Sequence, residues 1–216
     1  MMRLAPTLLG FAGLLAASAT FALAGTAGPI EESDVTTHRS QGEVRTIEGA
    51  RARLSRTAGG IFVALETAGL TPGHAYTLLL AVMNDPGACE STPCAPSDVV
   101  GRTAEVKADI VGDADGVIVG EDGMARFASF LPAGALPKAW FGNGLTNPEG
   151  AEVHLVVNDH GPFLPERGAE MLTTYRGGCA DESVPGAFPD TAKADGAPGP
   201  NTCRMVQVAI FAPANM

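Results

Sequence analysis

The sequence predicts an all-β protein, an antiparallel sandwich or barrel, from two observations. Short apolar runs recur at a spacing of roughly ten residues and are separated by residues that favour turns. No segment after the first two dozen residues shows a sustained helical period, and a short turn near 165–169 is the most helix that we expect. Many short strands with turn chemistry between them are typical of sandwiches and barrels.

Seven segments have the composition of strands. We expect strands at 60–67, 74–84, 106–111, 116–119, 125–131, 151–157 and 203–211. Residues 74–84 are the most apolar, which indicates burial on both faces. Asp115-Gly116 and Asp122-Gly123 favour hairpin turns, and the Pro, Gly, Asp and Ala residues of 180–201 predict a long surface loop.

The first 24 residues have the layout of a secretory signal. Arg3 precedes a long apolar stretch, and the small residues Ala22 and Ala24 precede the expected cleavage before Gly25. A membrane anchor is the alternative. We expect a signal peptide at 1–24, a flexible N-terminal arm at 25–42 and one β-sandwich domain at 43–216, without a membrane span after cleavage. The predicted location is secreted or periplasmic.

The chain contains four cysteines, an even number, which predicts disulfides in an oxidising compartment. Of the three connectivities, we favour Cys89 with Cys94 and Cys179 with Cys203, so that the second bridge pins the 180–201 loop. A zinc site is the alternative, but neither pair has the spacing of a zinc knuckle.

The balance of acidic and basic residues limits the class of binding partner. The sequence has 14 basic and 24 acidic residues, and the basic ones are scattered. Nucleic-acid surfaces need clustered Lys and Arg, so the sequence excludes this class of partner. A protein or a glycan partner, of unknown identity, remains.

The candidate metal ligands gather around the 151–157 strand. His154 lies on one face of it with Glu152, and Asp159 and His160 follow it. Imidazole and carboxylate groups bind copper or zinc, and His74 can join them if its strand is a neighbour. The alternative is that 159–162 forms a turn in which His160 bonds to backbone carbonyls. No cofactor is certain; copper or zinc is the candidate.

Two further features have both a functional and a structural interpretation. Trp140 and Phe141 lie in a glycine-rich loop, where exposed aromatic rings stack on sugars or anchor a partner; core packing is the alternative for Trp140. Acidic residues between 109 and 122 suit either calcium or hairpin turns, and their spacing does not match the twelve-residue calcium loop.

Segments 69–77 (GLTPGHAYT), 151–162 (AEVHLVVNDHGP) and 174–179 (TYRGGC) carry a resemblance. With them the chain resembles a group of uncharacterised secreted bacterial proteins and, more loosely, the immunoglobulin-like β-sandwiches of the CHRD type. The resemblance implies an immunoglobulin-like sandwich, here with long disulfide-pinned loops. It implies no established activity.

The sequence favours a protein without catalysis. Hydrolase and phosphate-loop motifs are absent, and so is the His-x-His pattern of copper/zinc superoxide dismutases. We therefore expect a secreted or periplasmic binding or envelope-associated module. The alternative is a copper- or zinc-binding, redox-active protein that uses His154 and His160.

Overall fold

A computed structural model describes residues 28–214, so the predicted signal peptide at 1–24 lies outside the described residues. The strands are β1 (Ile30–Ser33), β2 (Thr36–Thr37), β3 (Arg51–Thr57), β4 (Gly60–Thr67), β5 (His74–Met83), β6 (Ala108–Ile118), β7 (Ala125–Pro132), β8 (Glu152–Pro162) and β9 (Arg204–Phe211). The helices are α1 (Pro96–Gly101), α2 (Thr103–Val106), α3 (Gly168–Thr173) and α4 (Asp190–Lys193). Short 3₁₀ turns are η1 (Arg39–Gln41), η2 (Pro86–Ala88), η3 (Pro165–Arg167) and η4 (Asp181–Ser183).

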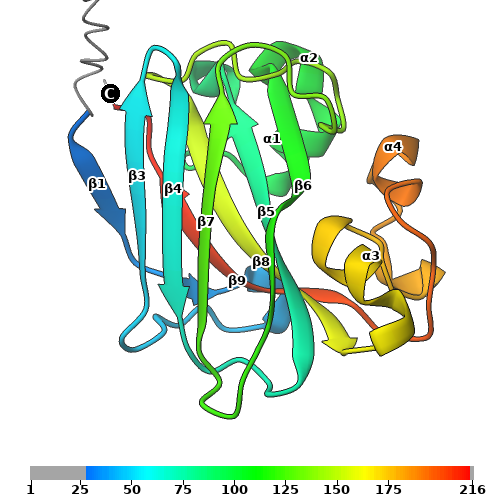
Figure 1. Cartoon of the computed structure of the whole chain (residues 1–216). Coiled ribbons are helices and arrows are strands. Elements are labelled where there is room, and N and C mark those ends of the chain that lie inside the picture. Colours follow the sequence, from blue (N-terminus) through cyan, green and yellow to red (C-terminus); the bar gives the residue numbers. More distant parts are fainter. Residues whose placement is uncertain (1–27, 215–216) are drawn as a thin grey trace, which may run out of the picture.

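The strands form two antiparallel sheets that face each other as a β-sandwich (Figure 1), which confirms the predicted all-β class. One sheet has four strands in the order β1-β3-β4-β7, and the other has five in the order β2-β9-β8-β5-β6. β5 and β8 are neighbours, so His74 does lie on a strand beside β8. No helix in the described part of the chain is long and apolar enough to cross a membrane.

The main core lies between the two sheets. Leu54 and Val63 of the four-stranded sheet and Leu80 and Leu155 of the five-stranded sheet are at most 1% exposed within one cluster. Each such side chain contributes about 1.5–3 kcal/mol on burial. The alternation along the strands therefore decides which residues hold the sheets together.

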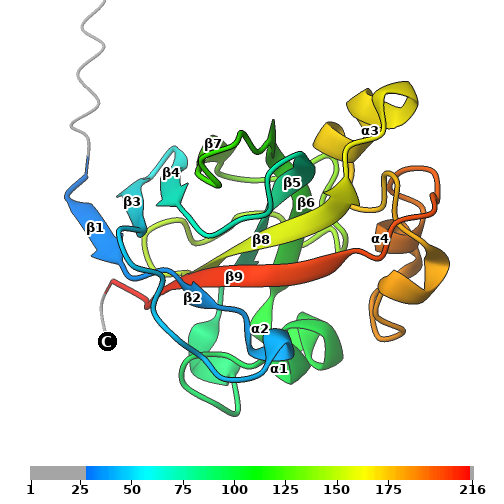
Figure 2. The same cartoon turned by 90° about the horizontal axis from the view of Figure 1, so that it is seen from below.

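A second cluster covers the outer face of the five-stranded sheet, the face turned away from the four-stranded sheet. Leu79 of β5 and Val156 of β8 pack there with Val99 of α1 and Val106 of α2. Figure 2 shows α1 and α2 on this side of the sheet. Because both faces are covered, nearly every residue of β5 is buried, as predicted.

The predicted flexible arm at 25–42 is wrong for the residues that the structure describes. Residues 30–33 pair with β3, and residues 36–37 pair with β9. Val35, between the two short strands, is fully buried. The segment has too few apolar residues to show a period, yet its backbone hydrogen bonds complete an edge of each sheet.

Two further predictions about local structure are wrong. Residues 96–106 form α1 and α2 around buried Val99 and Val106, but helices of six and four residues are too short to show a period. The predicted turn at Asp115-Gly116 lies inside β6, paired with β5. The backbone of Leu172 lies very close to Gly116. A Cβ at position 116 would lie 2.2 Å from the carbonyl oxygen of Leu172, so this close approach requires glycine.

Residues 159–162 also continue a strand instead of forming a turn. Asp159 pairs with Tyr76, and β8 extends to Pro162. Gly161 has a φ of 79°, and its amide donates to Oδ1 of Asp159 at 2.8 Å. The strand β8 thus contains an irregular backbone conformation at Gly161, where the Asp-His-Gly-Pro sequence suggested a turn.

Both predicted disulfides are present. Cys89 is joined to Cys94 and Cys179 to Cys203, with sequence separations of 5 and 24 residues. The second bridge closes the predicted 180–201 loop at its base. That loop contains η4 and α4, and its Phe188 packs on the outer face of the five-stranded sheet.

Candidate functional site

The residues predicted to bind metal fall at separate places. Along β8, His154 and His160 point to the outer face, where Val156 belongs to the outer cluster. They are six residues apart, about 20 Å at the rise of an extended strand. The structure therefore does not bring His154 and His160 together.

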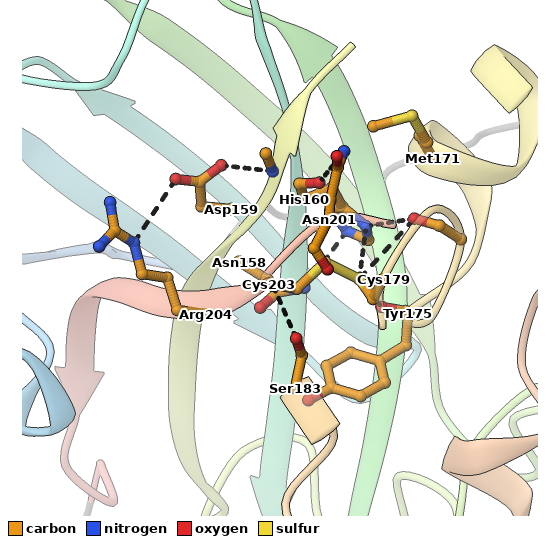
Figure 3. Close-up of a disulfide and its surroundings, with 12 residues drawn as sticks. Asn158, Asp159, His160, Met171, Tyr175, Cys179, Ser183, Asn201, Cys203 and Arg204 are labelled. Atoms are coloured by element: carbon orange, nitrogen blue, oxygen red, sulfur yellow. Dashed lines mark hydrogen bonds and ion pairs between the residues drawn. A yellow bond between two sulfur atoms is a disulfide. The ribbon is translucent and has the colours of Figure 1, made fainter. Parts of the chain in front are cut away.

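His74 and Asp159, by contrast, are brought together. Nδ1 of His74 lies 2.9 Å from Oδ1 of Asp159, and Nε of Arg204 lies 3.8 Å from Oδ2. Figure 3 shows Asp159 pointing toward Arg204. Asp159 is 2% exposed, so this pair is a buried carboxylate held between a histidine and an arginine.

His160 is fully buried beside the second disulfide, with its Nδ1 3.5 Å from Sγ of Cys179 (Figure 3). Its Nδ1 lies 2.9 Å from the oxygen of Gly177, and its Nε2 lies 2.9 Å from Oγ1 of Thr77. Burial lowers the pKa of His160, so the ring is held neutral. Both ring nitrogens have hydrogen-bond partners. One partner is a backbone carbonyl, as predicted by the alternative in which His160 bonds to the backbone and not to a metal.

One compact group of three metal-capable side chains occurs in residues 28–214, and it consists of His160, Cys179 and Cys203. Zinc and copper bind cysteine as the thiolate. The two sulfurs are joined to each other, so they offer no thiolate in this state. Binding of copper or zinc by the predicted set His154, His160, Asp159 and His74 stays a prediction.

His154 is paired with a carboxylate at the other end of β8. Its Nε2 lies 2.7 Å from Oε1 of Glu152, which is 2% exposed and also accepts a hydrogen bond from the amide of Cys94 at 2.7 Å. The carboxylate orients the imidazole ring. Nδ1 is therefore the ring atom that remains for a ligand.

His154 lies in the floor of a groove that we call the outer-face groove. Two rows of facing residues cross the five-stranded sheet and form this floor. The first row is Thr36, Val208, Val156 and Leu79. The second row is Ile210, His154, Ala81 and Ile110. His154 is the titratable member of an otherwise mainly aliphatic surface.

Three segments wall the outer-face groove. Pro96 and Val99 belong to α1, His38 and Arg39 lie at η1, and Phe188 comes from the 180–201 loop. In Figure 2 the turn after β2 lies close to α1. The groove holds about 200 Å³. Segments far apart in the sequence thus close around one apolar surface.

Nothing in the sequence indicated that His38 and Arg39 wall a groove. His38 and Arg39 follow β2 in a segment without apolar periodicity, and only the pairing of β2 with β9 brings them over the sheet. No pattern of spacing marks them. The signal that could have found them is the run of apolar residues on both faces of β5, which requires a cover on the outer side.

Trp140 is not an exposed anchor, because it is 3% exposed and packs against Tyr175 and Phe188 with ring centroids 4.8 and 5.1 Å away. Core packing, the alternative, is what this ring does. Phe141 is half-buried beside the same cluster. A sugar cannot stack on the face of a buried indole, so this part of the predicted binding site is wrong.

Acidic residues of β6 accept hydrogen bonds from backbone amides of the protein. Asp109 is fully buried and accepts hydrogen bonds from the amides of Phe141 at 2.9 Å and Gly144 at 2.6 Å. Asp115 accepts from the amides of Gly116 and Ala128. These carboxylates hold loops and strands in place, but Asp109 and Asp115 do so from within β6 and not from the hairpin turns that the sequence suggested.

No known protein family, no curated protein and no solved structure matches this chain.

Proposed function

We propose that the protein is an exported, non-catalytic binding module that holds a small apolar ligand in the outer-face groove. The observation that carries this proposal is the groove itself: a mainly aliphatic floor formed by five strands and walled by α1, η1 and Phe188. Ligand pockets are concave, mainly apolar and supplied with a few placed polar groups. His154, held by Glu152, is such a group.

The volume of the groove limits the ligand. About 200 Å³ is below the range of roughly 300–1,000 Å³ for sites of drug-sized molecules. It exceeds the cavity of about 150 Å³ that accepts benzene in an engineered core. A short aliphatic chain or a single ring fits this space, whereas a folded protein domain or an oligosaccharide does not enter it.

Export and the finer fold assignment belong to the same proposal. The signal pattern at 1–24 and the two disulfides support a secreted or periplasmic location. The resemblance to CHRD-type sandwiches supports an immunoglobulin-like relationship. A small-ligand carrier in the cell envelope fits these features without a catalytic motif.

The test is binding of 1-octanol, a neutral probe with a short aliphatic chain, measured by isothermal titration calorimetry. The matched pair of variants is Ile210→Trp, which places an indole in the groove floor, and Ile118→Trp, which places it at the exposed end of β6 outside the groove. We expect Ile210→Trp to weaken octanol binding at least about tenfold, because the indole occupies the space of the ligand.

Ile118→Trp should bind octanol as the unmodified protein does. Absence of octanol binding to the unmodified protein, or equal binding by the two variants, would contradict a ligand site in the groove. Thermal unfolding of both variants checks that the fold is retained.

A further inference from the structure

The charge of the outer-face groove is opposite to that of the chain. The protein carries a formal net charge of −10. The groove, however, is lined by Arg39, His38 and His154, and no acidic side chain lies among its described lining residues. Glu152 stands behind His154 and is engaged by it. An overall acidic protein thus presents the permanent positive charge of Arg39, and no lining carboxylate, to any molecule that enters the groove.

The ring of His38 is oriented by its own turn. Its Nδ1 accepts a hydrogen bond from the amide of Ser40 at 3.2 Å, as the N-cap of η1. Nε2 therefore carries the proton of the neutral ring and is a donor. Burial, together with Arg39 and His154, lowers the pKa of His38, which keeps the ring neutral. His38 and His154 both line the groove.

His154 offers a second polar atom. Because Glu152 accepts from Nε2, the free nitrogen of this ring is Nδ1. The side chain is 12% exposed, so a ligand in the groove reaches it while bulk water has little access.

Arg39 supplies the permanent charge. It is exposed at the rim of the groove and forms no ion pair with any acidic residue of the described part of the chain. Six of the nine other arginines between residues 28 and 214, such as Arg53 and Arg56, pair with a carboxylate. A free guanidinium above an apolar floor is matched to a planar anion such as a carboxylate.

We propose that the ligand is a short amphiphilic carboxylate, whose aliphatic part lies on Val156 and Leu79 and whose carboxylate meets Arg39 and the Nε2–H donor of His38. This inference rests on the proposed function. At roughly 30 Å³ per water-sized group, 200 Å³ holds about seven such groups, which corresponds to a tail of about six to eight carbons.

Octanoate and 1-octanol test the inference because they share a tail length and differ in the charge of the head. We expect the unmodified protein to bind octanoate about tenfold more tightly than octanol by calorimetry, since charge-assisted hydrogen bonds are the stronger ones. Arg39→Gln should remove most of this difference, because octanoate loses more affinity than octanol when the guanidinium is absent. Arg51→Gln, an exposed arginine on β3 of the other sheet, is the matched control and should preserve the difference.

Each outcome separates the two proposals. If octanol binds as tightly as octanoate, or if Arg39→Gln leaves their ratio unchanged, the carboxylate inference is overturned while the groove remains a site for apolar ligands. If neither compound binds, the proposed function fails together with the inference. The octanoate preference should also shrink in high salt, because the guanidinium is exposed to solvent.

Discussion

Oε1 of Glu152 lies 2.7 Å from both Nε2 of His154 and the amide nitrogen of Cys94. One buried carboxylate oxygen therefore joins the first residue of β8, the floor of the outer-face groove and the small disulfide loop that leads into α1. This contact links the position of the groove wall to the orientation of the histidine in its floor.

Removal of this carboxylate should destabilise the protein. Glu152→Ala leaves the buried amide of Cys94 without an acceptor, at a cost of about 1–3 kcal/mol in the free energy of unfolding. Urea denaturation measures it. Glu152→Gln keeps an acceptor oxygen and should lose less, and Glu149→Ala, at an exposed position, should lose almost nothing. Equal losses at 149 and 152 would contradict the role of the contact.

The two disulfides should differ in their contribution to stability. The Cys179–Cys203 bridge spans 24 residues and the Cys89–Cys94 bridge spans 5. In the chain-entropy treatment the longer loop contributes about 3 kcal/mol and the shorter about 2 kcal/mol. Urea denaturation of the two Cys→Ser double variants should show the larger loss for the 179/203 pair. The reverse order would show that native contacts, not loop length, dominate.

The stability of the protein should fall in mild acid through His160. Burial lowers its pKa in the folded state below the ordinary 6.5, so the unfolded chain takes up a proton at a higher pH than the folded protein. The stabilising effect is complete well above pH 6.5 and is lost as the pH falls below it, with a slope of at most about 1.4 kcal/mol per pH unit for one proton.

Urea denaturation between about pH 7 and pH 5 checks this dependence. His160→Gln should give a shallower slope than the unmodified protein. The pKa of His38 is lowered as well, so part of the slope remains in that variant and should decrease further when His38→Gln is added. An unchanged slope in the double variant would rule out both histidines as its source.

The packing of Trp140 should be sensitive to a single methyl group. A Cβ on Gly112 would lie 2.7 Å from Cβ of Tyr175 and 2.9 Å from Cζ2 of Trp140. We expect Gly112→Ala to cost about 1–3 kcal/mol of unfolding free energy, because a packed interior resists added volume. Gly186→Ala, where a Cβ meets nothing within 4 Å, is the control. Both are measured by urea denaturation with Trp140 fluorescence, and equal stability of the two variants would contradict tight packing.

Much of the fold was predictable because the sandwich depends on a local pattern. The range 60–67 was predicted as a strand with the bounds of β4, and the alternation of Val153 and Leu155 placed them in the core. Burial of 74–84 on both faces was also predictable, from the apolar composition of this segment. The predicted cysteine pairs are the ones present, since partners close in sequence are easily brought together.

The candidate site was less predictable. The sequence placed His154 on the predicted 151–157 strand and His160 beyond its end, but the strand continues through Asp159 to Pro162, which carries the two rings far apart. The sequence left both an exposed and a core-packed Trp140 open, and Tyr175 and Phe188 cover it from segments that follow much later in the chain. A single sequence does not show which distant segments supply such a cover.

The sequence by itself determined the all-β class, the disulfides and the face of β8 to which each side chain belongs, because these follow from the two-residue period of a strand and from nearest neighbours along the chain. Only the tertiary structure decided that Arg39 and His38 stand over Val156 and His154 as one groove. The pairing of β2 with β9 depends on backbone hydrogen bonds between segments about 170 residues apart, and these bonds carry no side-chain pattern.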